Sequence, residues 1–198
     1  MRDILVENAA PASASNVLKR QQITPGRIIA GSIAGAVAFF CLCFLVFGRV
    51  TEKTFSDKGI SITLTSAFHE AELHEEELAK GELPFLLCYD SYKTTVYVTR
   101  EAFADYEPLE TFSLDRYTRL RISSAEWVDG AALEHTASGI PYFEFEENGT
   151  SGQLKQIIRC YTYRSDDAFW LVEFLADASD AASLRPQFDA WAETVAFP

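Results

Sequence analysis

FWLVEFL, residues 169–175, is the stretch of this sequence that most constrains the fold. As a strand it would carry apolar side chains on both faces, because successive side chains point to opposite sides: Trp170, Val172 and Phe174 against Phe169, Leu171 and Leu175. A strand that is apolar on both faces must be covered on both. The sequence therefore predicts a single sheet with helices above and below it.

The other expected strands precede this stretch in the chain. Alternating apolar and polar residues, and short apolar runs bounded by turn residues, predict strands at 60–65, 85–90, 94–99, 132–136, 140–146 and 154–164. Between the last two, Asn148 and Gly149 accept the positive φ angles of a tight hairpin turn. Residues 49–59 are polar and are expected to be a spacer before the first strand.

Two helices are expected to cover the sheet. Ser113 is a favourable N-cap for a helix that runs to about residue 123. Its apolar face would consist of Leu114, Tyr117, Leu120 and Arg121. A second helix is expected over residues 184–195, with Pro186 in its tolerant first turn. Its buried stripe would consist of Phe188, Trp191, Ala192 and Val195, so that Trp170 and Trp191 lie in one core.

An apolar run at residues 28–47 has no charge, and Ser32 carries its one polar side chain. At about 1.5 Å per residue, a helix of this length spans roughly 30 Å, the hydrocarbon thickness of a bilayer. A cleaved secretory signal is the main alternative, but its apolar core would be shorter and nearer the N-terminus. We therefore expect a transmembrane anchor over residues 25–48. Within it, the small residues Gly31 and Gly35 would allow a weak homodimer.

The charges divide unevenly about this run. Residues 1–27 carry four basic and two acidic side chains, which leaves 13 basic and 27 acidic ones for the remainder of a chain of net charge −12. An acidic domain repels nucleic acid and anionic head groups, so neither is expected as a partner. Basic residues nearly balance on the two sides of the membrane. We expect residues 1–24 to be a disordered cytoplasmic tail and the C-terminal domain to be extracellular.

Several segments resemble one known family in their order and aromatic placement: ISITLT, FLLCYDSYKTTVYVTREAF, FSLDRYTRL, GIPYFEFEENGT with RCYTY, and DAFWLVEF with FDAWAETVAF. Over most of residues 60–198 the chain resembles the PsbP-like α-β-α sandwich. The resemblance implies an α+β domain with one antiparallel sheet of about six or seven strands flanked by helices, here preceded by one transmembrane helix. It also implies an anchored surface protein of the Gram-positive type, or a non-enzymatic accessory subunit. It carries over no site residue.

The segment HEAELHEEE holds the strongest candidate metal ligands. Zinc proteases place two histidines at i and i+4, whereas His69 and His74 are five residues apart and would diverge on a helix. On a helix, His69, Glu72 and Glu76 would share one face and bind a divalent cation weakly. The same residues also suit a solvated acidic helical turn or loop over residues 67–80.

No sequence motif names a reaction. The chain has no G-x-S-x-G, P-loop or G-x-G-x-x-G pattern, and His135 has no recognisable nucleophile beside it. We expect no catalytic, cofactor-binding or metal residue and no cofactor. Cys88 and Cys160 form either a disulfide, if their Cα atoms lie within about 7 Å, or two buried thiols.

The expected function is a non-catalytic binding or accessory module for a protein or envelope partner, held at the bilayer through residues 28–47. The alternative is an uncharacterised enzyme or a weak metal-binding domain that uses His69, Glu72 and Glu76.

Overall fold

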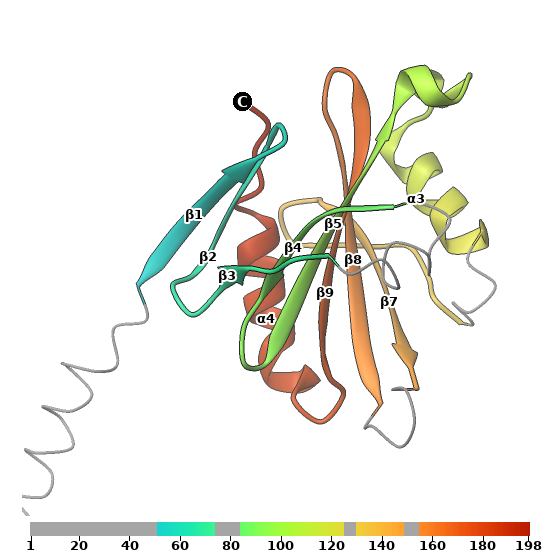
Figure 1. Ribbon diagram of the computed structural model, residues 1–198. Coiled ribbons are helices and arrows are strands. Elements are labelled where there is room, and N and C mark those ends of the chain that lie inside the picture. The colour runs from blue at the N-terminus through green and yellow to red at the C-terminus, as the bar shows by residue number, and fades with distance from the viewer. Residues whose placement is uncertain (1–50, 74–83, 125–129, 149–154) are drawn as a thin grey trace, which may run out of the picture. The chain divides into compact units, whose positions relative to one another are not determined.

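The computed structural model describes residues 51–73, 84–124, 130–148 and 155–198 (Figure 1). The predicted tail and anchor lie outside these ranges, and none of the helices within them is long and apolar enough to cross a bilayer. The strands are β1 (Glu52–Asp57), β2 (Ile60–Thr65), β3 (His69–Glu70), β4 (Phe85–Asp90), β5 (Thr94–Ala102), β6 (Glu134–His135), β7 (Pro141–Glu147), β8 (Gln156–Arg164) and β9 (Ala168–Asp177). The helices are the 3-10 turns η1 (Phe103–Asp105) and η2 (Leu109–Thr111), and the α-helices α3 (Leu114–Ser124) and α4 (Ala181–Ala192).

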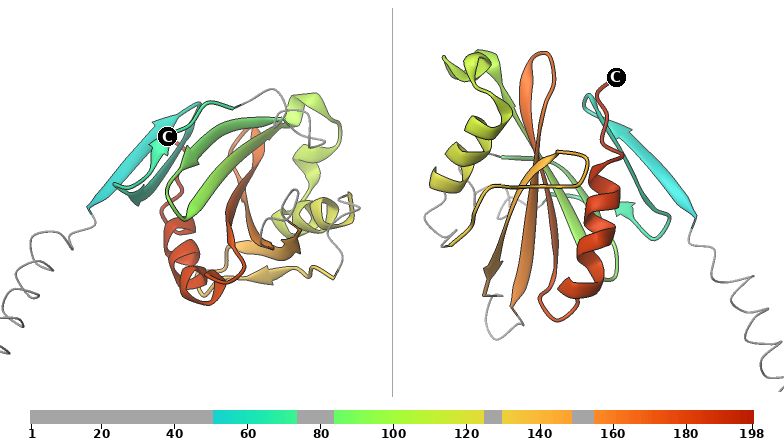
Figure 2. Two further views of the ribbon diagram at one scale, coloured as in Figure 1. Left: turned by 60° about the horizontal axis from the view of Figure 1, so that its bottom comes forward. Right: turned by 180° about the vertical axis from the view of Figure 1, so that it is seen from behind.

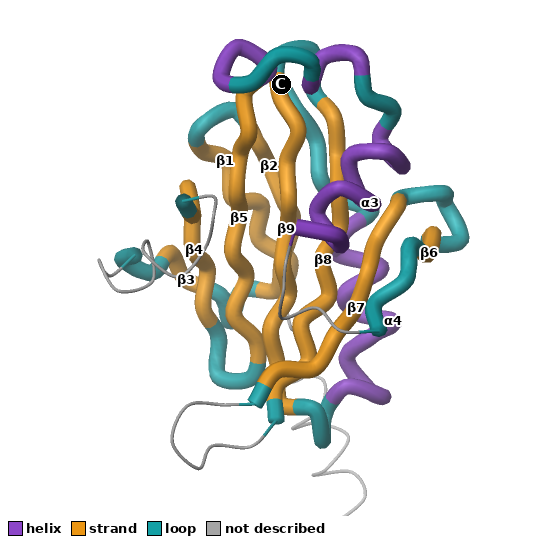
Figure 3. The backbone as a smooth tube through the Cα atoms, turned by 90° about the vertical axis from the view of Figure 1, so that its right-hand side faces the viewer, coloured by secondary structure: helices purple, strands orange, loops and turns teal. Residues whose placement is uncertain are grey.

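Seven strands form one antiparallel sheet in the order β3-β4-β5-β9-β8-β7-β6 (Figure 3). The strand β9 lies at its centre, between β5 and β8, as its apolar pattern predicts. Alternate residues of β9 pack on different helices. Phe169 stacks on Tyr117 of α3, with ring centroids 4.1 Å apart, and Phe174 stacks on Phe188 of α4 at 5.2 Å. The prediction of an α+β fold with helices on both faces of one antiparallel sheet is confirmed (Figures 1 and 2).

The strands β1 and β2 correct two predictions. They pair with each other in a separate two-stranded sheet, so residues 60–65 form a strand as expected but not in the main sheet. Residues 49–59, predicted as a spacer, contain β1. Lys58 and Gly59 make a two-residue turn with φ angles of 52° and 92°, which is the conformation that connects such hairpins. Because Phe55 is the one buried residue of β1, the strand has no alternation to detect.

The remaining strands follow the sequence closely. Residues 85–90 form β4 as expected, whereas β5 extends beyond residue 99 to Ala102. The weak strand predicted at 132–136 shortens to the two residues of β6. The strands β7 and β8 are antiparallel neighbours, as the hairpin prediction requires. Gly149 of the predicted turn lies outside the described residues.

The helix α3 begins where its cap predicts. The backbone N–H of Arg116 donates to Oγ of Ser113 at 3.2 Å, an N-cap bond. The predicted covering face is wrong at Leu120, which is 37% exposed. Thr118 is buried instead, and its Oγ lies 2.6 Å from Oγ of Thr162 on β8. A polar threonine therefore joins this helix to the sheet through a hydrogen bond, which an apolar pattern does not reveal.

The helix α4 begins three residues earlier than predicted, at Ala181 rather than at residue 184. Pro186 consequently lies in its second turn rather than its first. The core prediction is confirmed: Trp170 and Trp191 are buried together with Phe188. Phe197, after the helix, covers Trp170 with ring centroids 5.4 Å apart. The cover over Trp170 therefore includes the C-terminal segment as well as α4.

Candidate functional site

The alternative reading, a weak metal patch of His69, Glu72 and Glu76, requires these residues to share a helix, and the structure does not place His69 on one. His69 lies in strand β3, where it pairs with Asp90 of β4, and its side chain is exposed. Glu72 is exposed after the end of that strand, and Glu76 lies outside the described residues. His69 is therefore not on a helical face that it could share with Glu72 and Glu76. Among the residues that the structure describes, no three histidine, cysteine or acidic side chains come close enough to hold a metal ion.

The structure gives His135 a partner that the sequence did not indicate. Its Nε2 lies 3.1 Å from Oδ1 of Asp115, so β6 is held to the first turn of α3. Both side chains are substantially exposed, at 43% and 51%. An ion pair so open to water contributes little to stability. The pair joins two elements and lies on the surface.

A disulfide between Cys88 and Cys160 is excluded by their places in the sheet. Cys88 lies on β4 and Cys160 on β8, with β5 and β9 between them. Three strand spacings correspond to roughly 14 Å, twice the span that a disulfide tolerates. Both side chains are buried. One row across the sheet runs from Cys88 through Tyr97 and Glu173 to Cys160.

Glu173 is the acidic member of this row and the most unusual titratable group in the described domain. It is the one charged residue of FWLVEFL, and it lies on the α3 side of the sheet beside Cys160. Burial raises the pKa of its carboxyl to about 7, although Arg121 of α3 and a hydrogen bond from the Cys160 thiol act in the opposite direction. This carboxyl therefore gains or loses its proton near neutral pH.

The neighbouring thiol is not activated by this arrangement. Burial raises the pKa of Cys160, and the nearby charge of Glu173 raises it further. A thiol held in its protonated form is a poor nucleophile. Nε of Arg121 is also buried and has no hydrogen-bond partner among the described residues. The group is thus a partly buried acid with an adjacent cation, and a neutral thiol donates a hydrogen bond to it.

Glu173 is expected to make the domain less stable as the pH rises. Its pKa is near 4.5 in the unfolded chain and about 7 in the fold, so folding favours the protonated carboxyl. This favourable contribution is complete below pH 4.5 and is lost by pH 7, at a cost of about 3 kcal/mol. Glu173→Gln should remove this dependence and leave the variant more stable than the parent protein at pH 8.

Urea unfolding of both proteins between pH 4 and pH 8 measures the effect. Glu110→Gln, a change of the same type at an exposed position on η2, is the matched control. If the stability difference between parent and Glu173→Gln does not change with pH, Glu173 is not the group responsible.

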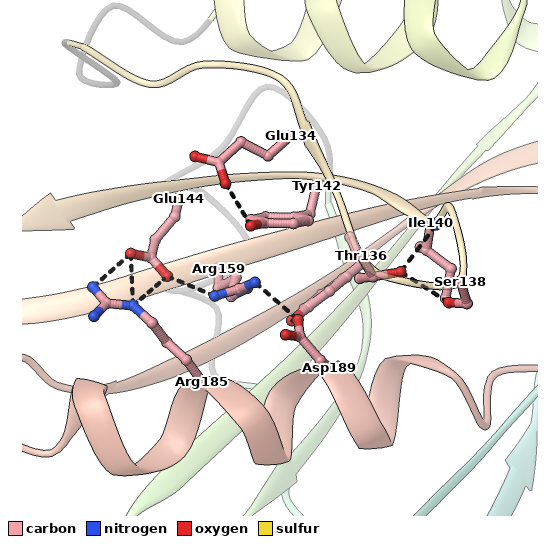
Figure 4. A network of polar contacts seen from close by, with 10 residues as sticks. Glu134, Thr136, Ser138, Ile140, Tyr142, Glu144, Arg159, Arg185 and Asp189 are labelled. Atoms are coloured by element: carbon pink, nitrogen blue, oxygen red, sulfur yellow. Dashed lines mark hydrogen bonds and ion pairs between the residues drawn. The ribbon is translucent and has the colours of Figure 1, made fainter.

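A second polar cluster lies on the other face of the sheet, between β7, β8 and α4 (Figure 4). At its centre is Arg159, which is only 5% exposed. Its Nη2 lies 2.8 Å from Oδ1 of Asp189 on α4, and its Nη1 lies 3.3 Å from Oε2 of Glu144 on β7. Arg185 of α4 binds the same Glu144 carboxylate at 2.7 Å. One buried guanidinium therefore bridges two carboxylates from different elements.

Two tyrosines enclose this guanidinium. The Arg159 Cζ atom lies 3.9 Å from the ring centroid of Tyr142, a cation–π contact. The Tyr161 hydroxyl donates to Asp189 at 2.6 Å, and the Tyr142 hydroxyl donates to Glu134 at 2.6 Å. Burial, together with the bond to Glu134, raises the pKa of Tyr142 to about 12. Both phenols therefore stay protonated. Each donates a hydrogen bond to a carboxylate, Tyr161 to Asp189 and Tyr142 to Glu134.

This cluster holds the layers of the fold together. Its charges are paired with one another across β7, β8 and α4, and Figure 4 shows them directed inward between the sheet and the helix. Nε of Arg159 is the exception, since it has no hydrogen-bond partner among the described residues. Sequence reasoning missed the cluster because its members are 15, 30 and 41 residues apart.

Comparison with known proteins gives likenesses of fold. No protein-family model and no curated protein matches the sequence. Similar solved structures include PsbP from Synechocystis sp. PCC 6803, with 9% identity and a TM-score of 0.46 over 75% of this chain and 94% of that one. LpqN of Mycobacterium tuberculosis has 10% identity and a TM-score of 0.39, over 76% and 92% of the two chains. PA94 from Pseudomonas aeruginosa has 12% identity and a TM-score of 0.37, over 74% and 96%.

A PsbP protein is therefore among the solved structures that this chain resembles, as the order of its segments predicts. The likeness concerns the arrangement of helices and strands. It carries no information on ligands or activity.

Proposed function

We propose that this chain is a single-pass membrane protein whose C-terminal domain lies outside the cytoplasm and serves as a non-catalytic binding or accessory module for a protein or envelope partner. The observation that carries the proposal is the uncharged apolar run at residues 28–47, followed after four residues by the first strand of a folded domain at Glu52. Such a run is long enough to span a bilayer as a helix.

The basic residues around the run support the proposed orientation. Lys19, Arg20 and Arg27 precede it, and Arg49, Lys53 and Lys58 follow it. Lys53 and Lys58 belong to the β1–β2 hairpin of the C-terminal domain. A long domain is translocated across the membrane largely regardless of its charge. The cations of the short N-terminal tail then favour a cytoplasmic N-terminus. Gly31 and Gly35 would let two such helices approach closely.

The chemistry of the described side chains supports a binding role over a catalytic one. The buried arginine Arg159 is held by Asp189 and Glu144, so its charge is neutralised inside the fold. The buried thiol of Cys160 has a raised pKa, which opposes nucleophilic chemistry. These groups stabilise packing between elements. The remaining acidic surface suits recognition of a partner that is not nucleic acid.

Full-length protein is expected to remain in the membrane pellet after washing with alkaline carbonate. High pH disrupts ionic contacts at the membrane surface but does not extract a helix that spans the bilayer. A variant that lacks residues 28–47 should appear in the supernatant as a folded domain. Immunoblots of the two fractions, with N-terminal sequencing of the pelleted protein, measure this. Release of the full-length chain, or a mature N-terminus near residue 49, would overturn the anchor.

A further inference from the structure

The outer edge of β1 is an exposed strand edge with an unusual charge pattern. The strand pairs with β2 on one side, and no strand of the described residues pairs with it on the other (Figures 1 and 2). Five of its six residues are exposed, and Phe55 is buried. An edge of this kind presents unpaired N–H and C=O groups to any second strand.

The turn geometry identifies which backbone groups are open. Asp57 and Ile60 flank the two-residue turn and form a hydrogen-bonded pair, so Phe55 and Lys53 also direct their backbone groups toward β2. Thr54 and Ser56 then direct theirs outward. The same alternation holds on β2, where Ser61, opposite Ser56, exchanges backbone bonds of 2.8 Å and 3.0 Å with Ala196 on the side away from β1.

The residues of this edge are complementary to themselves when one copy is reversed against another. The stretch is EKTFSDK, residues 52–58. In an antiparallel pair centred on Phe55, Lys53 faces Asp57 of the second copy, and Thr54 faces Ser56. Glu52 likewise comes opposite Lys58, just beyond the strand. Each opposite-charge pair occurs twice because of the two-fold symmetry.

Other alignments lose this match. Centred on Thr54, the pairing places Lys53 against Phe55 and leaves the acidic residues without opposite charges. The alignment centred on Phe55 also brings Thr54 and Ser56 together, the two residues whose backbone groups point outward. Backbone geometry therefore permits the register centred on Phe55, and the charges select it over the one centred on Thr54.

We propose that β1 pairs with β1 of a second copy of this chain, antiparallel and centred on Phe55, to give one continuous sheet β2-β1-β1′-β2′. About four backbone hydrogen bonds form between Thr54 and Ser56 of the two copies. Two cross-strand ion pairs between Lys53 and Asp57 flank these hydrogen bonds and stabilise the contact. The contact is small, and confinement in one membrane, which rests on the anchor proposed above, raises the effective concentration of the two copies.

A zero-length cross-link tests the register directly. Full-length protein, half of it labelled with heavy nitrogen, is reconstituted in phosphatidylcholine vesicles and treated with a carbodiimide. An amide should form between Nζ of Lys53 and the carboxyl of Asp57, with loss of water, in peptides that combine heavy and light chains. Within one extended strand these residues are roughly 13 Å apart, so the link requires two copies. Absence of mixed-isotope links between these residues would overturn the proposal.

Exchanging the charges of Lys53 and Asp57 tests whether their ion pairs hold the two copies together. Lys53→Asp should lower the association constant about tenfold, since two attractive pairs become repulsive. The double variant Lys53→Asp/Asp57→Lys should restore it. Energy transfer between donor- and acceptor-labelled copies measures association, and Lys155→Asp on the distant β8 side is the matched control. Equal association of all four proteins would contradict the proposed pairing, and would leave these charges only the role of keeping other strands from the edge of β1. A carbonate wash of the same vesicles reports failure of the anchor separately.

Discussion

Trp170→Ala is expected to lower the free energy of unfolding of the domain by about 3–5 kcal/mol, the typical cost of truncating a buried tryptophan. The side chain is 2% exposed on the central strand β9. Its ring packs on Phe197, and its Nε1 donates to Oγ of Ser165 at 3.0 Å. A domain is usually stable by about 5–15 kcal/mol, so this loss removes a large part of the total.

Denaturant midpoints of a fragment covering residues 51–198 measure the effect. This fragment includes β1, which the sequence had assigned to a spacer. Trp191→Ala should behave similarly, because Trp191 stacks on Phe174 of the same sheet at 5.8 Å. Tyr92→Ala is the control, since Tyr92 is 98% exposed and should change stability by less than about 0.5 kcal/mol. Equally small shifts for all three variants would contradict the layered core.

Arg159→Ala is expected to destabilise the domain by about 3–5 kcal/mol, because it leaves the carboxylates of Glu144 and Asp189 without their shared buried cation. The loss of the contact between Arg159 and the Tyr142 ring adds to this effect. The helix α4 should loosen first, since Asp189 is its link to Arg159. Urea unfolding of the parent and the variant measures the change.

Arg185→Ala provides the matched control for this prediction. Arg185 binds the same Glu144 carboxylate at 2.7 Å, but its side chain is 42% exposed. An ion pair that exposed usually contributes less than about 1 kcal/mol. If the two arginine variants lose equal stability, burial is not what makes Arg159 important.

The central features of the fold could be predicted from the sequence because they depend on the spacing of apolar residues along each strand and helix. The doubly apolar stretch at 169–175 predicted a central strand with cover on both faces, and the structure has it. The strand β1 was not predicted because Phe55 is the one buried residue among its six, and a single apolar residue does not produce an alternation of period two. The start of α4 was predicted three residues late, although Asp180, a favourable N-cap residue, comes directly before Ala181; its side chain makes no capping hydrogen bond in the structure.

The polar groups around Glu173 and Arg159 were harder to predict from the sequence, for a different reason. Glu173 did leave a signal, as a lone acid inside an apolar strand, and a raised pKa is what such a position produces. Arg159 left none, because its partners Glu144 and Asp189 come from other elements and meet it only in three dimensions. The alternative of a metal patch at His69 loses its basis, because His69 pairs with β4 in a strand and does not lie on the helix that the patch requires.

The compartment of the folded domain tests the proposed function most directly. Tyr92→Cys, at the exposed tip between β4 and β5, is introduced into the full-length chain, and intact cells are treated with a membrane-impermeant maleimide. The parent protein is the control, since its Cys88 and Cys160 are buried and its Cys41 and Cys43 fall within the apolar run proposed as the anchor. We predict labelling of the variant and not of the parent, with the labelled protein in the membrane fraction. Labelling of the variant only after the cells are permeabilised would contradict an extracytoplasmic domain.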